Sequence, residues 1–100
     1  MQHSRSKSEI RAQAARRLEL ARERLASLQP GGSPTCTIEV TSAAVIESHA
    51  SAMQCPHCIG TYRVLEHTRP IPGLRRLDVE CRYCATPRAL WFRLVTDEPN

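Results

Sequence analysis

Two pairs of cysteines have the spacing of metal ligands. Two residues separate Cys55 from Cys58, two separate Cys81 from Cys84, and 22 residues lie between the pairs. Zinc in structural sites takes four soft ligands in a tetrahedron, and a two-residue gap lets one tight turn direct both thiolates to a single point. The sequence therefore predicts that these four cysteines bind one structural Zn²⁺ ion.

The composition indicates that the fold needs such a metal. The chain has 100 residues and only four aromatic side chains, all of them in the last 40 positions: Tyr62, Tyr83, Trp91 and Phe92. We therefore expect the packed core in the C-terminal half, with too little apolar surface for a robust fold on its own. Structural zinc contributes an apparent binding free energy of about 10–16 kcal/mol, which would make up the deficit.

The segment from about Met53 to Val95 resembles the zinc ribbon family, in which two cysteine knuckles hold a small antiparallel sheet. The tetrapeptide CPHC (55–58) fits the common C-P-x-C form of the first knuckle. Ribbon knuckles often have glycine directly after the second cysteine, whereas Ile59 and Ala85 stand there in this chain. The resemblance implies a fold and a ligand set but no activity, because zinc ribbons serve transcription factors, ribosomal proteins, polymerase subunits and enzyme appendages alike.

The CPHC tetrapeptide also occurs in the active site of DsbA-like thiol oxidases, where a helix N-terminus lowers the pKa of the first thiol. That chemistry needs a helix that starts at the motif, whereas the following residues, IGTYRV (59–64), are typical of a strand. The first ten residues are polar and basic, unlike a secretory signal, so we expect a reducing cytoplasmic location. Thiol redox chemistry therefore ranks as a third interpretation, and a disulfide scaffold is disfavoured on the same grounds.

The remaining reactive side chains have structural interpretations. Cys36 falls on the apolar face of a predicted strand, which favours a buried structural thiol. His57 is expected to be a turn residue directed away from the metal, with substitution for one of the cysteine ligands as the alternative. Glu66 and His67 are adjacent on a predicted strand and point to opposite faces, so they do not form an acid–base pair. We therefore expect a protein that is not an enzyme.

The N-terminal segment is predicted to be a basic amphipathic helix from about Ser6 to Leu28. Residues 1–29 carry seven basic and three acidic side chains and hold the entire net charge of +4, while residues 30–100 are balanced. Ser6 with Glu9 resembles a capping box, and QPGGSP (29–34) ends the helix. Apolar and small residues recur at spacings of four and three, as in the seam of a coiled coil: Ile10, Ala14, Leu18, Ala21, Leu25 and Leu28. Such a seam predicts pairing with a protein partner or a second copy, with docking on the chain's own domain or partial disorder as alternatives.

The C-terminal part is predicted to be a small antiparallel sheet. Cys36, Ile38 and Val40 alternate with polar residues, and Val45 and Ile46 could extend or resume that strand. Further strands are expected over residues 61–67, 74–80 and 88–95, with a loop or hairpin tip over 68–73.

The last of these strands is apolar on both faces, which is typical of a central strand. The predicted class is thus small α+β, with a helix over 1–29, a Pro/Gly linker or hinge over 30–35 and a zinc-ribbon β domain over 36–97.

These features favour a non-enzymatic zinc-binding adaptor for protein–protein interaction in a larger assembly. The alternative is a nucleic-acid-binding zinc ribbon that acts with transcription or translation machinery through the helix residues Arg16, Arg17, Arg22 and Arg24. Six arginines and two tyrosines of the sheet region could form a face that contributes to such binding: Arg63, Arg69, Arg75, Arg76, Arg82 and Arg88 with Tyr62 and Tyr83. Alternatively, these arginines could pair with Glu66, Asp78 and Glu80. No apolar run approaches the roughly 20 residues that span a bilayer, so no membrane partner is expected.

Overall fold

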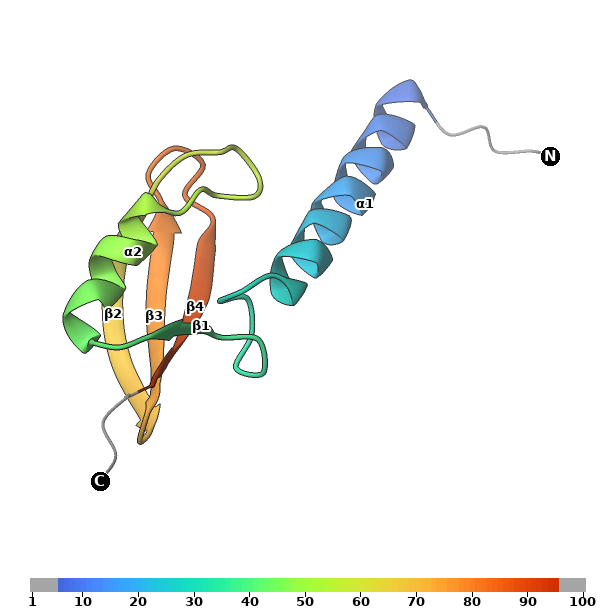
Figure 1. The fold of residues 1–100 in the computed structure, drawn as a ribbon. Helices are drawn as coiled ribbons and strands as arrows, with labels where there is room; N and C mark the ends of the chain where they lie inside the picture. Colours follow the sequence, from blue (N-terminus) through green and yellow to red (C-terminus); the bar gives the residue numbers. More distant parts are fainter. Residues whose placement is uncertain (1–5, 96–100) are drawn as a thin grey trace.

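The computed structural model describes residues 6–95 and shows a small α+β fold, as predicted (Figure 1). Residues 1–5 and 96–100, which include Arg5 and the outer ends of the predicted segments 1–29 and 36–97, lie outside the described part. The elements follow in the order α1 (Lys7–Leu28), β1 (Ile38–Val40), the 3₁₀ helix η1 (Ala43–Val45), α2 (Ile46–Ala52), β2 (Tyr62–Ile71), β3 (Leu74–Cys81) and β4 (Pro87–Leu94).

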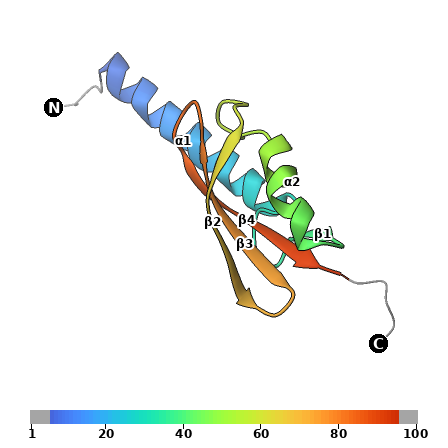
Figure 2. The same ribbon diagram turned by 90° about the vertical axis from the view of Figure 1, so that its left-hand side faces the viewer.

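Helix α1 forms where the sequence predicted it. The Ser6 hydroxyl oxygen caps the helix by accepting a hydrogen bond from the backbone N–H of Glu9 at 3.3 Å. Among its residues only Ala26 is buried, so most of the helix projects away from the sheet (Figure 1 and Figure 2). The resulting shape is elongated, with extents of 73 × 24 × 18 Å.

The four strands form one mixed sheet in the order β1-β4-β3-β2. Strands β2, β3 and β4 pair antiparallel, but β1 runs parallel to β4, with Ile38 opposite Phe92 and Val40 opposite Leu94. The expectation of a purely antiparallel sheet is therefore wrong at β1. The reason is that η1 and α2 carry the chain from the β1 edge to the β2 edge, which leaves β1 beside the last strand. The prediction that the last strand is central is confirmed.

Residues 43–52 are helical, so the suggested strand extension at Val45 and Ile46 is also wrong. The hydroxyl oxygen of Ser42 accepts a hydrogen bond from the backbone N–H of Ala44 at 3.1 Å and starts the helical turn. Ile46 and Ala50 are fully buried four residues apart, and half-buried Met53 follows three residues later. This helical spacing places one apolar face of α2 on the core, a pattern that alternation would not give.

The first hairpin is longer than predicted, because β2 continues to Ile71 through most of the expected loop. Pro70 lacks an N–H, but β2 is an edge strand, where that loss is tolerated. The turn is reduced to the residues between Ile71 and Leu74, and Gly73 adopts the left-handed φ of 83° that glycine accepts readily.

The linker over residues 30–35 packs against the sheet instead of acting as a loose hinge. The backbone N–H of Gly31 donates to the carbonyl of Cys36 at 2.7 Å, and the N–H of Trp91 donates to the carbonyl of Gly31 at 2.8 Å. Cys36 lies ahead of β1 and is half-buried, with its thiol 3.4 Å from the carbonyl oxygen of Leu28. These contacts connect the end of α1 to the central strand.

Candidate metal centre

Four sulfur atoms meet at one end of the sheet. The Sγ atoms of Cys55, Cys58, Cys81 and Cys84, here called the four-cysteine cluster, all lie within 4.8 Å of one another. Two of the distances are 3.7 Å (Cys55 to Cys84) and 3.3 Å (Cys58 to Cys81), and none of the four cysteines is in a disulfide. A tetrahedral ion with metal–sulfur bonds of about 2.3 Å has sulfur–sulfur edges of about 3.8 Å. The cluster therefore has the size and the soft ligands that a metal ion needs.

The first cysteine pair lies in a tight turn. The N–H of Cys55 donates to the carbonyl of Gly60 at 2.8 Å, and the N–H of Ile59 donates back to the carbonyl of Cys55 at 2.8 Å. Ile59 has a φ of 56°, in the left-handed region that favours glycine. Isoleucine thus adopts a backbone conformation that glycine takes more readily.

The second pair lies in a turn of the same form. The N–H of Cys81 donates to the carbonyl of Thr86 at 3.1 Å, and the N–H of Ala85 donates to the carbonyl of Cys81 at 3.0 Å. Ala85 has a φ of 59°, which matches Ile59 in the first turn. We call residues 55–60 the first knuckle and residues 81–86 the second knuckle.

The cluster is continuous with the hydrophobic core. Cys55 and Cys81 are each 1 % exposed and pack in the core with Tyr62 and Val79, whereas Cys58 and Cys84 are at the surface. Gly60 provides the necessary space, since a Cβ atom there would lie 2.9 Å from the sulfur of Cys81. The core therefore encloses two of the four sulfur-bearing side chains, and the knuckle turns bring the other two beside them at the surface.

Hydrogen bonds shift the pKa values of three of the thiols in opposite directions. The hydroxyl and the backbone N–H of Thr86 lower the pKa of Cys84 to about 6, and the hydroxyl oxygen lies 3.1 Å from its sulfur. The backbone N–H groups of Cys84 and Tyr83 lower the pKa of Cys81. The hydrogen bond to Cys81 raises the pKa of Cys58 to about 12, because the proton shared between the two sulfurs stays on Cys58. A divalent cation would replace such protons and allow all four sulfurs to bind as thiolates.

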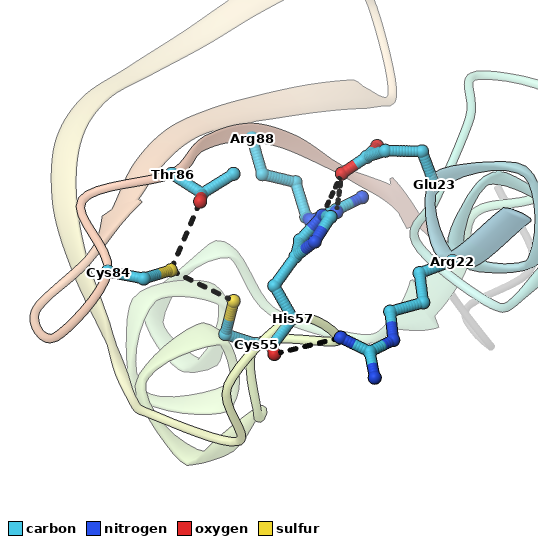
Figure 3. Close-up of polar contacts among 7 residues, drawn as sticks. All are labelled: Arg22, Glu23, Cys55, His57, Cys84, Thr86 and Arg88. Atoms are coloured by element: carbon cyan, nitrogen blue, oxygen red, sulfur yellow. Dashed lines mark hydrogen bonds and ion pairs between the residues drawn. The ribbon is translucent and has the colours of Figure 1, made fainter. Parts of the chain in front are cut away.

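His57, which sequence reasoning treated as a plain turn residue, connects the first knuckle to α1 (Figure 3). Its Nε2 atom lies 2.5 Å from Oε1 of Glu23, and the same oxygen accepts a hydrogen bond from the Nη2 group of Arg88 at 2.5 Å. Arg22 also donates to the backbone carbonyl of His57 at 3.4 Å. The ring of His57 is therefore engaged by the helix and does not join the four-cysteine cluster as a substitute ligand.

The carboxylate of Glu23 is ionised in this contact. Partial burial would raise its pKa, but the hydrogen bond from His57 and the positive charge of Arg88 outweigh that effect and lower it. Arg88 itself is almost enclosed, with a side chain 9 % exposed, and it was expected on the outer face of the sheet. No periodic pattern could have revealed this contact, since its three side chains come from distant parts of the chain.

Tyr62 does not belong to an exposed arginine and tyrosine face of the sheet. Tyr62 is 2 % exposed and belongs to the core, and its burial raises its pKa to about 12. Two of the expected ion pairs are present, between Arg63 and Glu80 at 3.2 Å and between Arg76 and Asp78 at 2.9 Å. These two arginines, like Arg88, are thus engaged in ion pairs within the chain.

The side chain of His67 contacts both α2 and β3. Its Nδ1 atom lies 3.5 Å from the carboxylate of Glu47, and its Nε2 atom lies 3.3 Å from the guanidinium of Arg75. Glu66 is on β2 opposite Asp78 and does not share these contacts. The prediction that Glu66 and His67 form no acid–base pair agrees with this placement.

The residues after the CPHC motif lead into a strand. After Cys58 come the left-handed residue Ile59 and then β2, so within residues 6–95 no helix begins at the motif.

No helix in this described part is long and apolar enough to cross a membrane. No family model, curated protein or solved structure matches this chain.

Proposed function

We propose that this chain is a non-enzymatic, zinc-binding adaptor in which a structural metal holds a rigid frame and α1 presents a protein-binding surface. The observation that carries this proposal is that α1 is anchored at its C-terminal half while its apolar seam is left uncovered. All six seam residues are exposed: Ile10, Ala14, Leu18, Ala21, Leu25 and Leu28.

Zinc is the metal that the ligand chemistry favours. Four thiolates at tetrahedral spacing suit Zn²⁺, and four protein ligands leave no open coordination position for a substrate. In this proposal the fold is a zinc ribbon extended by β1 and α2, and the cytoplasm keeps its thiols reduced. The metal then supports the fold and takes no part in a reaction.

The metal part is tested by native mass spectrometry and thermal melting of protein purified without chelator. We expect one zinc ion per chain, and a loss of cooperative melting when a strong chelator removes it, because the binding free energy of about 10–16 kcal/mol exceeds or equals the stability of most small domains. A metal-free chain four hydrogens lighter would contradict the proposal and favour thiol redox chemistry.

The adaptor part is tested by partner recovery with seam variants of the zinc-loaded chain. Leu18→Asp with Leu25→Asp should reduce recovery strongly, whereas Leu20→Asp is the matched control because Leu20 is an exposed leucine outside the seam. Unchanged recovery and unchanged oligomeric state in the double variant would contradict the adaptor. Binding of oligonucleotides that weakens steeply with salt and depends on Arg16 and Arg24 would instead establish the nucleic-acid alternative.

A further inference from the structure

The anchored side and the seam of α1 lie on opposite faces of the helix. At about 100° per residue, the six seam positions fall within a sector about 80° wide, and Glu23 and Ala26 lie on the far side of the helix axis. Glu23 makes the ionic contact with His57 and Arg88, and Ala26 is the buried residue of the helix. The contact with the knuckle therefore orients the seam away from the sheet.

The charges of α1 are sorted in the same way. Its three acidic residues, Glu9, Glu19 and Glu23, all fall on the anchored side at this helical period. Arg17 and Arg24 follow one border of the seam and Arg11 follows the other, and all three are exposed. We call the six seam residues together with Arg11, Arg17 and Arg24 the arginine-edged seam. It combines an apolar centre with positive borders and no acidic side chain.

This charge pattern disfavours a second copy of the chain as the occupant. In a paired helix the residues that border the two seams face each other, so a parallel or an antiparallel homodimer would bring arginine against arginine. Like charges in such positions destabilise pairing, and two of the six seam residues are alanines that bury little area. An acidic border on the partner would convert the same contacts into attraction.

We infer that the arginine-edged seam binds an amphipathic helix of another protein, one whose apolar stripe has glutamate or aspartate on both borders. This inference rests on the proposed adaptor function and specifies the class of partner. The 22 residues of α1 present about 33 Å of helix, which is three heptads of a two-stranded coiled coil. Figure 1 shows that most of this length is clear of the sheet and open to a partner helix.

The test uses two synthetic 21-residue helical peptides with leucine at the a and d positions. The acidic probe has glutamate at the e and g positions, and the basic probe has lysine there. Binding of each fluorescent probe to the zinc-loaded full chain is measured by anisotropy. We expect the acidic probe to bind at least ten-fold more tightly than the basic probe, with an affinity that falls as salt is added.

Variants of the chain locate the binding surface. Leu18→Asp and Leu25→Asp should each weaken the acidic probe about ten-fold or more, because each removes a leucine contact, while Leu20→Asp should leave its affinity unchanged. The double change Arg17→Glu with Arg24→Glu should reverse the preference toward the basic probe. All of these side chains are exposed, so the variants should keep the melting temperature of the parent chain.

Equal affinity for the two probes would overturn the inference, and so would an unchanged preference after the charge reversal. A seam-dependent homodimer in sedimentation experiments, or tighter seam-dependent binding to anionic vesicles than to the acidic probe, would overturn it in favour of those occupants. If neither probe binds although the Leu18 and Leu25 variants still abolish partner recovery, the adaptor function stands and the acidic helix is wrong. If neither probe binds and the Leu18 and Leu25 variants also leave partner recovery unchanged, the adaptor function itself is wrong.

Discussion

The two knuckles have the same backbone but different neighbours. Each has the same pair of backbone hydrogen bonds and a left-handed residue after its second cysteine, Ile59 in one and Ala85 in the other. The residue directly before the second cysteine differs in its role. The side chain of His57 is 14 % exposed and contacts α1, whereas Tyr83 is 80 % exposed.

This difference shows that the backbone and the side chains of a knuckle have separate roles. The turn hydrogen bonds come from the backbone, so the turn is compatible with different side chains at the two positions between the cysteines. The side chains at those positions then determine what lies beside the four-cysteine cluster: a helix at the first knuckle and solvent at the second. Changes at equivalent positions of the two knuckles should therefore have unequal effects.

The largest effect is expected at the residue that closes each knuckle. In the first knuckle, Gly60→Ala would place a Cβ atom 2.9 Å from the sulfur of Cys81 and 2.5 Å from Cδ2 of Tyr83, and we expect a loss of about 2–3 kcal/mol with weaker metal retention. In the second knuckle, Thr86→Ala removes one hydrogen bond to Cys84 and should cost about 1 kcal/mol. Denaturant unfolding and competition with a chromogenic chelator measure both effects. Equal losses would contradict this distinction between the knuckles.

A smaller effect is expected from breaking the contact between α1 and the first knuckle, which has no counterpart at the second knuckle. Glu23→Gln keeps the size of the side chain but leaves the enclosed guanidinium of Arg88 without its ionised partner, which should cost about 1–2 kcal/mol. Release of the helix should also speed tryptic cleavage at the arginines of α1. Glu19→Gln is the control, and similar cleavage in both variants would show that the Glu23 contact does not hold the helix.

The same contact should depend on pH in a defined window. Because the pKa of Glu23 is lowered in the folded state, its contribution is complete above the usual value of 4.5 and is lost as pH falls through the lower folded value. The difference in stability between the parent chain and Glu23→Gln should therefore shrink in acid as pH falls through the folded pKa of Glu23. A difference that grows below pH 4.5 would contradict this assignment.

The smallest effect is a gain of stability at the left-handed residues. Ile59→Gly and Ala85→Gly relieve a conformation that costs an L-residue about 1–2 kcal/mol, partly offset by the greater freedom of glycine in the unfolded chain. We expect each to raise the free energy of unfolding by about 0.5–1 kcal/mol, with the larger gain at Ile59, because a β-branched side chain tolerates a positive φ poorly. A loss at either position would show that the side chain makes a contact worth more than the strain.

Local patterns in the sequence predicted the local features of the fold. The spacing of the cysteines predicted the four-cysteine cluster, the capping residue Ser6 predicted where α1 begins, and the two-sided apolar pattern of Leu90 to Leu94 predicted a central strand. Each of these signals lies in residues within a few positions of one another, and the two cysteine pairs, 22 residues apart, could be joined because structural zinc takes four ligands. The short helix α2 left a similar signal in the spacing of Ile46, Ala50 and Met53, which was outweighed by two β-branched residues in succession.

Features that depend on distant residues could not be predicted in this way. The parallel pairing of β1 with β4 joins residues more than 50 positions apart, and the contact of Glu23 with His57 and Arg88 joins three elements. An arginine on a strand and a glutamate on a helix look like ordinary surface residues when each is considered alone. Only the packed arrangement shows that Arg88 is enclosed and that Glu23 compensates its charge.

The position of β4 in the sheet has a consequence for how the chain is made. The ribosome synthesises proteins from the N-terminus, and β4, the last described strand to be synthesised, is the one that both β1 and β3 need as a neighbour. Until residues 87–94 are made, β1 has no pairing partner in the sheet. The sheet can therefore close only after β4 has been made, and a chain truncated before Pro87 would expose an unpaired edge of β3 and would lack Leu90 and Phe92 from the core.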